Sequence, residues 1–247
     1  MDIEIINLFK DFDRHPVLRG VNLTIRDGET MVIIGRSGCG KSVLLKHIIG
    51  LMKPDEGQVI ADGEEVSRLD DPGLHRLRMK FGMLFQGAAL FDSLTVGENV
   101  AFPLREHTAK TEEGIQSRVK ECLGLVGLAG IEHLKPAELS GGMRKRVGLA
   151  RALAMEPRVI LYDEPTTGVD PVMADVINRL IKGLHDRLKV TSVVVTHDMV
   201  SAYRVGDRIA MLHEGKILQA GTVEEIRSTK NPIVKQFILG VSENGGG

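Results

Sequence analysis

Eight consecutive residues near the start of the chain have the types and spacing of a phosphate-binding loop. They follow the pattern G-x-x-x-x-G-K-[ST] and read Gly35-Arg36-Ser37-Gly38-Cys39-Gly40-Lys41-Ser42. The glycines can adopt backbone angles that other residues avoid, so successive N–H groups can turn inward around an anion. We expect Lys41 to reach the β- and γ-phosphates of a nucleotide and Ser42 to ligate Mg²⁺. The segment therefore predicts a site for nucleotide phosphates.

The residues on either side of this loop match the structure that it requires. Residues 29–34 form a short apolar run rich in β-branched side chains, which predicts a buried strand. Residues 41–51 carry apolar side chains at helical spacing, and a helix beginning at the loop would add its dipole to the phosphate site. The order strand, loop, helix favours this site over a glycine-rich turn that only precedes a structural helix.

Two carboxylates follow a second apolar strand. The strand predicted at 159–162 leads directly into Asp163 and Glu164, and parallel strands bring such residues to the edge of the sheet where ligands bind. We expect Asp163 to help Ser42 hold Mg²⁺, and Glu164 to polarise the water that attacks the γ-phosphate. The alternative is that the two acids cap the next helix.

Gln86 and His197 also follow predicted strands, at 81–85 and 192–195. His197 is in position to contact the γ-phosphate, although a histidine there is also typical of a surface site or a helix start. Gln86 is neutral, so it can bind Mg²⁺ or water and release them easily, as a sensor of the nucleotide requires.

A second glycine segment reads Leu139-Ser140-Gly141-Gly142-Met143. Ser140 is a good N-cap for a helix through 144–154, and the two glycines let a phosphate approach the start of that helix. Because the chain already has one phosphate loop, we expect this segment to serve the nucleotide of another copy. In isolation, Ser-Gly-Gly fits a simple turn equally well.

The composition is that of an ordinary globular protein. The chain has 247 residues, 43% hydrophobic and 26% charged, with a net charge of −1, which gives no basic surface for nucleic acid. No apolar run approaches a transmembrane helix, and the start has no signal-peptide pattern, so we expect a cytoplasmic protein that reaches membranes through a partner. Cys39 and Cys122 are not expected to form a disulfide.

The alternation of predicted strands and helices indicates an α/β fold with a doubly wound, mostly parallel sheet. Strands at 3–8, 18–25 and 58–61 predict an antiparallel β layer beside it. Residues 96–155 have helical periodicity, residues 172–188 predict another helix, 208–212 a further strand, and 106–114 a charged surface connector. We expect one domain at 1–240, with a core at 1–86 and 157–240, a helical subdomain at 87–156, and a flexible tail at 241–247.

Taken together and in order, these motifs resemble those of an ABC-type ATPase. The match covers nearly the whole chain and includes the phosphate loop, residues 139–143, Gln86, Asp163-Glu164, Asp170 and His197. The resemblance implies a homodimer in which two subunits pair head to tail around two ATP molecules. Each site would then join one copy's phosphate loop to the other copy's Ser140, Gly141 and Gly142.

The same resemblance implies further roles. Asp170 matches the loop that links the two sites, and Phe12 matches the aromatic residue that stacks on adenine, with Phe9 as the alternative. Met143 departs from the pattern, because most of the superfamily has glutamine there. The implied cofactors are ATP and Mg²⁺.

Within the ABC ATPases, residues 86–100, 139–143 and 161–168 look like those of Mla-type transporters, a family that includes toluene-tolerance and plastid lipid-import relatives. That family moves phospholipids between membranes with a permease and a lipid-binding domain protein. The resemblance implies an ATPase held at the inner face of the cell membrane by its permease. Residues 88–91 are expected in or beside the groove that receives a permease helix, with Ala88 tolerant of a larger side chain. The alternative is that Leu90 and Phe91 are core residues.

Other functions remain as alternatives. One is an importer ATPase for amino acids or other polar solutes. Non-transport ABC proteins usually carry two cassettes or a long insertion, and this chain has neither. A GTP-binding switch would need an Asn-Lys-x-Asp motif, which the sequence lacks.

Overall fold

The centre of the protein is a six-stranded sheet. In this computed structural model, which describes residues 1–241, the strand order is β10-β9-β3-β8-β7-β6. Five strands are parallel, with registers such as Thr30 opposite Ser192 and Phe81 opposite Val159, and β10 is antiparallel to β9. The strands are β3 (Thr30–Ile34), β6 (Phe81–Leu84), β7 (Val159–Asp163), β8 (Thr191–Thr196), β9 (Arg208–His213) and β10 (Lys216–Thr222).

A second sheet is antiparallel and has the order β2-β1-β4-β5. Its strands are β1 (Ile3–Phe12), β2 (His15–Ile25), β4 (Glu56–Ala61) and β5 (Glu64–Glu65). Helix α1 (Lys41–Ile48) follows the phosphate loop, and its buried Leu44, Leu45 and Ile48 pack in one cluster with residues of both sheets. The start of α1 is therefore fixed between two rigid layers.

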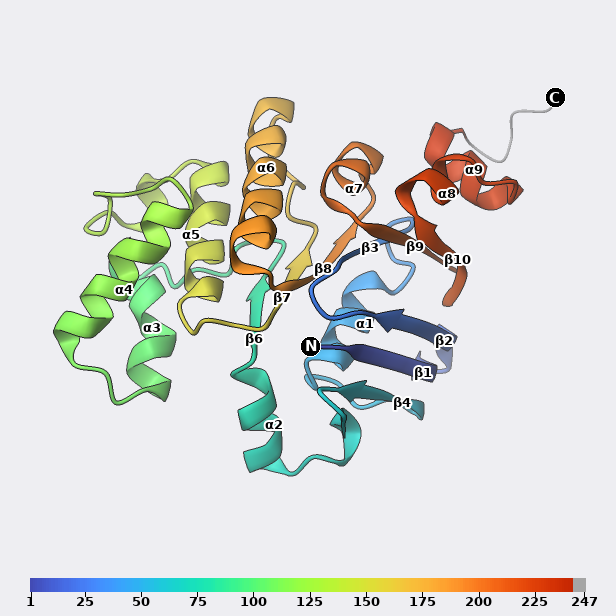
Figure 1. Cartoon of the computed structure of the whole chain (residues 1–247), viewed down its shortest axis with the longest axis horizontal. Coiled ribbons are helices and arrows are strands. Elements are labelled where there is room, and N and C mark those ends of the chain that lie inside the picture. The colour runs from blue at the N-terminus through green and yellow to red at the C-terminus, as the bar shows by residue number, and fades with distance from the viewer. Residues whose placement is uncertain (242–247) are drawn as a thin grey trace.

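The other helices extend the fold at both ends. Figure 1 shows α3, α4 and α5 together at one end of the molecule, with the antiparallel sheet, α8 and α9 at the other. The helices are α2 (Asp71–Arg78), α3 (Val96–His107), α4 (Glu112–Leu125), α5 (Gly141–Leu153), α6 (Pro171–Leu188), α7 (Met199–Val205), α8 (Val223–Arg227) and α9 (Pro232–Leu239), with short 3-10 turns at Val66–Arg68 and Pro136–Glu138.

Strand β3 separates two apolar cores. Met31 and Ile33 belong to the core shared with α1 and the antiparallel sheet, whereas Val32 and Ile34 belong to the core that includes α3 to α7. This alternation follows from the two-residue period of a strand. The central sheet is buried on both faces, as its continuous apolar runs predict.

The predicted fold class is confirmed, and one local prediction is wrong. Residues 106–114 are not a continuous surface connector, because α3 runs to His107 and α4 begins at Glu112. Thr111 caps α4 by accepting a hydrogen bond from the Gly114 N–H, so the charged residues lie on helix ends. Helices α2, α7, α8 and α9 were not predicted.

Two further points concern the ends and the membrane. Within residues 1–241, no helix is both long and apolar enough to cross a lipid bilayer. The tail predicted at 241–247 lies outside the described residues except for its first position. The division into a core and a helical subdomain stays a prediction.

Candidate functional site

A cavity of about 420 Å³ lies over the phosphate loop. Its walls come from the loop and α1, from the end of β1, and from the ends of β6, β7 and β8. The lining residues are Phe12, Val17, Ser37, Gly38, Gly40, Lys41, Ser42, Val43, Gln86, Glu164, Thr167 and His197. The fold thus gathers side chains from five separate segments, most of them predicted from the sequence.

Backbone geometry explains the glycines of the loop. Gly38 and Gly40 have φ of 80° and 104°, in the left-handed region that favours glycine. A Cβ at Gly35 would lie 2.3 Å from the carbonyl oxygen of Leu212, so no side chain fits there. The Lys41 Nζ is buried and donates to the carbonyls of Gly35, at 2.8 Å, and Arg36, at 3.1 Å.

Ser42 lines this cavity, and its side chain is joined to Asp163, which does not line it. The Ser42 hydroxyl donates to the Asp163 carboxylate over 2.7 Å, which joins the first turn of α1 to the end of β7. Burial raises the pKa of Asp163, partly offset by the Ser42 hydrogen bond. A hydroxyl and a carboxylate are oxygen ligands of the kind that Mg²⁺ prefers, so the two residues fit this ion. Gln86 lines the same cavity with an exposed side chain.

Glu164 is the most connected carboxylate of the site. One oxygen lies 3.3 Å from the Lys41 Nζ. The other lies 2.8 Å from the His197 Nδ1 and accepts from the Thr167 hydroxyl at 3.1 Å. Its backbone has φ of 49°, uncommon for a residue other than glycine. The surroundings therefore hold this side chain in one place, and neither acid caps α6, because Asp170 does.

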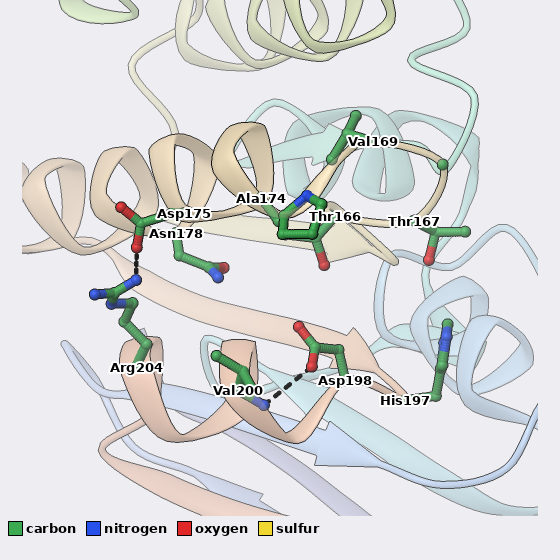
Figure 2. Close-up of a pocket in the computed structure, with 12 residues that line it drawn as sticks. Thr166, Thr167, Val169, Ala174, Asp175, Asn178, His197, Asp198, Val200 and Arg204 are labelled. Carbon is green, nitrogen blue, oxygen red and sulfur yellow. Dashed lines mark hydrogen bonds and ion pairs between the residues drawn. The ribbon is translucent and has the colours of Figure 1, made fainter.

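A second cavity, of about 510 Å³, adjoins this group between α6 and α7. Figure 2 shows Thr167 and His197 at one end of it and the Asp175–Arg204 ion pair at the other. His197 and Thr167 line both cavities. Asp170 follows the loop that borders this second cavity and accepts a hydrogen bond from the Met173 N–H at 2.9 Å.

The residues predicted from the second glycine segment do not line the cavity over the phosphate loop. Ser140 is exposed and caps α5 by accepting from the Met143 N–H at 3.2 Å, as its sequence position predicted. Gly141 and Gly142 open the same helix. Met143 packs against the apolar core. Within one chain, this helix start and the phosphate loop are therefore separate.

Two aromatic residues were candidates for the adenine platform. Phe12 lines the cavity and is 40% exposed, with the Lys10 Nζ 5.7 Å from its ring centre. Phe9 does not line it. Its ring packs on Gly20 instead, where a Cβ would lie 3.0 Å from the ring. The geometry favours Phe12.

The sequence analysis missed Thr167 and Lys145. Thr167 contacts Glu164 directly, and its position three residues after the acid was the available signal. Lys145 is a buried cation on α5 whose Nζ donates to the carbonyl oxygen of Glu164 at 3.1 Å. Only the folded chain brings those two segments together.

A third cavity differs in character. It is apolar, measures about 420 Å³, and is lined by Ile49, Leu51, Phe81, Gly82, Met83, Phe85, Ala89, Phe91, Phe102, Pro103, Arg151, Ala152 and Met155. We call it the apolar groove. Phe91 is 44% exposed and its ring packs on Phe102, with centroids 4.8 Å apart, so Phe91 is not a core residue.

The prediction for Ala88 is wrong. Ala88 is 1% exposed, has φ of 62°, and its carbonyl accepts from Arg151 at 2.8 Å. A larger side chain there would disturb the fold rather than the groove. Ala89, rather than Ala88, is exposed and lines the apolar groove.

Comparison with known proteins follows the same motifs. The family model described as ABC transporter matches residues 18–167. The chain belongs to the ABC transporter family. It is an ATPase of a transport system.

Relatives with different names match almost the whole chain. It is 43% identical to the probable ribonucleotide transport ATP-binding protein mkl of Mycobacterium tuberculosis, covering 97% of this chain and 67% of that one. It is 42% identical to the intermembrane phospholipid transport system ATP-binding protein MlaF of Haemophilus influenzae, and this match covers 98% of this chain and 91% of that one. It is 44% identical to the chloroplastic protein TRIGALACTOSYLDIACYLGLYCEROL 3 of Arabidopsis thaliana, and this match covers 96% of this chain and 73% of that one.

A solved structure matches as well. A dimeric ATP-binding cassette bound to ADP and phosphate has a TM-score of 0.83 and 38% identity, and the match covers 90% of this chain and 98% of that one. The fold predicted from the sequence is therefore that of a nucleotide-binding cassette.

Proposed function

We propose that this chain hydrolyses ATP to power a permease that moves phospholipids between membranes. The observation that carries the catalytic part is the cavity lined by Lys41, Ser42 and Glu164, with Asp163 hydrogen-bonded to Ser42 beside it. The observation that supports the lipid part is the likeness, over nearly the whole chain, to relatives named for phospholipid transport or for a glycolipid.

The proposed chemistry assigns one task to each group. Residues 35–42 surround the phosphates, with Arg36, Ser37 and Cys39 contributing backbone N–H groups. Ser42, Asp163 and Gln86 would hold Mg²⁺, which would supply positive charge to neutralise the phosphates. Glu164 orients the attacking water, and His197 holds the Glu164 carboxylate and faces the γ-phosphate.

Binding of ATP requires Lys41 to change partners. In the described structure its Nζ is engaged with two loop carbonyls and lies 3.3 Å from Glu164. A γ-phosphate in the cavity would offer Lys41 a stronger anionic partner, which would free the Glu164 oxygen that faces Lys41 to contact water while the other oxygen stays beside His197. The ion pair thus keeps the site ordered before nucleotide arrives.

The proposed active unit is a head-to-tail homodimer. Ser140 is exposed, Gly141 is half-buried and Gly142 is buried at the start of α5, away from the chain's own phosphate loop, so we propose that this helix start meets the nucleotide of a second copy through Ser140 and the backbone of Gly141. Asp170, at the start of α6, would connect the two sites. The dimeric state of the related cassette supports this arrangement.

The apolar groove is the proposed contact with the permease. It exposes Phe85, Phe91 and Phe102 together, and apolar grooves of this kind receive amphipathic helices. Docking there would hold the protein at the inner face of the cell membrane. A lipid-binding domain protein would complete the assembly.

The experiment is reconstitution with a permease that co-purifies with this chain. Proteoliposomes containing the complex should move fluorescent phospholipid to acceptor vesicles only with hydrolysable ATP. A second candidate cargo is a ribonucleotide, favoured by the name of the mycobacterial relative. ATP-dependent uptake of labelled ribonucleotide without lipid transfer would replace the lipid proposal and leave the ATPase proposal intact.

A further inference from the structure

We infer that Lys145 is a positioning residue for hydrolysis, which fixes the backbone of Glu164 and ties it to the helix that begins at Ser140. The inference rests on the proposed function, in which Glu164 orients water and Ser140 serves a second copy. It adds a physical connection between those two roles through α5.

The first observation is a buried cation with a specific partner. Lys145 is 6% exposed, and its Nζ donates to the carbonyl oxygen of Glu164 at 3.1 Å. Burial lowers the pKa of Lys145, while the nearby carboxylates of Glu164 and Asp163 act in the opposite sense. Because burying a lysine costs free energy, an apolar residue would suit a purely structural position better.

The second observation is the strained backbone at the other end of the bond. Glu164 has φ of 49° and is held from its N–H, which donates to the Val195 carbonyl at 3.0 Å. Lys145 holds the same residue from its carbonyl, which also accepts from the Thr167 N–H at 3.2 Å. A non-glycine residue keeps such a conformation only where its surroundings determine it, so these bonds together set the direction of the Glu164 side chain, and Lys145 supplies the one that comes from α5.

The third observation is the packing of the start of α5. A Cβ on Gly142 would lie 2.4 Å from the Met173 side chain, which belongs to the first turn of α6 after Asp170. The start of α5 is therefore in close contact with the segment that follows Glu164. Lys145 lies five residues after Ser140, about 7.5 Å along a helix, so the two residues move as one rigid body.

The consequence is a direct link between two nucleotides. When Ser140 and the glycines engage the second copy's γ-phosphate, any shift of α5 reaches the chain's own Glu164 through Lys145. Lys145 does not line the cavity over the phosphate loop, and among residues 1–241 its side chain donates a hydrogen bond to the backbone carbonyl of Glu164 rather than to the Glu164 carboxylate. Its loss should therefore affect turnover and spare nucleotide binding.

The test compares two variants of neighbouring residues in the full chain. Lys145→Met keeps the apolar stem and removes the donor. Arg146→Met is the control, because Arg146 donates to the carbonyls of Val126 and Gly127, away from Glu164. Lys145→Met should lower kcat roughly 10- to 100-fold, as misplacement of a reacting group does. KM and ATP affinity should stay within about twofold.

Two additional measurements separate positioning from structure. Lys145→Arg keeps a donor and should recover most of the lost kcat. Lys145→Met added to Glu164→Gln should lower kcat no further, because residues that act through one group are not additive. If Lys145→Met is poorly soluble, Lys145→Leu, which also lacks a donor, takes its place in the same cycle.

The outcomes are distinguishable. Wild-type kcat in Lys145→Met, a loss matched by Arg146→Met, or an additive loss with Glu164→Gln would each overturn this inference. If Glu164→Gln itself turns over at the wild-type rate, the proposed function fails instead, whatever Lys145 does.

Discussion

The cavity over the phosphate loop and the apolar groove have the same volume, about 420 Å³, and opposite chemistry. The first concentrates charged and polar groups around Glu164. The second exposes aromatic side chains, with Phe85, Phe91 and Phe102 on its surface. Both cavities lie next to the end of strand β6. Of the two residues that follow this strand, Phe85 lines the apolar groove and Gln86 lines the cavity over the phosphate loop.

The two cavities depend on different properties for the specificity of binding. The polar cavity depends on individual atoms, as the strained Glu164 and the Ser42–Asp163 hydrogen bond show. The groove depends on shape and apolar area, which no single atom determines. Phe85 and Gln86 are adjacent in the chain and line different cavities. A movement of the backbone at one cavity would therefore also move the other.

The largest expected effect breaks the polar site alone. Glu164→Gln keeps the shape of the side chain and removes its basic oxygen, so ATP hydrolysis should fall about 10²- to 10⁴-fold while ATP still binds. Steady-state hydrolysis and equilibrium nucleotide binding measure the two quantities. Hydrolysis at the wild-type rate would remove Glu164 from the proposed role.

A change in the groove should leave the polar site working. Phe91→Glu places a charge on its exposed surface, so affinity for the permease should fall about 10- to 100-fold, as for an interface anchor, whereas hydrolysis by the isolated chain should persist. Leu188→Glu is the matched control, with a similar exposure of 42% at the end of α6. Equal co-purification of the permease with both variants would argue against the groove as the contact.

A substitution at Asp163 should show that its buried charge lowers the stability of the folded state. Burial raises its pKa, so its charged form is disfavoured in the folded state. The cost is present when pH is above the folded pKa and disappears below the ordinary value of about 3.9. Asp163→Asn should therefore melt at a higher temperature than the wild type at pH 7, with no such gain near pH 3, while losing Mg²⁺-dependent hydrolysis. A lower melting temperature at pH 7 would contradict this explanation.

The smallest effect concerns the helix that carries Phe102. Thr95 and Glu98 form a reciprocal capping box at the start of α3, with hydrogen bonds of 3.2 Å and 2.6 Å. Thr95→Ala should lower the free energy of unfolding by about 1 kcal/mol, measured by urea denaturation. Hydrolysis should not change. A loss above about 3 kcal/mol would mean that Thr95 has a further role.

The polar site could be predicted because its chemistry is written in short segments. A phosphate loop, a strand ending in Asp163-Glu164, and strands ending in Gln86 and His197 each carry their own signal, and a parallel sheet must bring those ends together. Apolar periodicity indicated the sheet and α6 for the same reason.

The rest needed the folded chain. The groove joins residues from β6, α3, α5 and the segment after α1, and these residues share no pattern. The positive φ and the burial of Ala88 could not be seen in a run of small residues. Lys145 gave no signal, because its partner is a backbone carbonyl of a distant segment. Short helices such as α7 have too few turns for periodicity to appear.

The central claim is that each nucleotide site is completed by a second copy. The most direct measurement is the mass of the Glu164→Gln protein with ATP and Mg²⁺, by light scattering after gel filtration, with bound nucleotide counted in the same peak. The account predicts a dimer with two ATP molecules, and a monomer that still binds ATP when Ser140→Arg is added. A monomer in the single variant, or a dimer unaffected by Ser140→Arg, would contradict it.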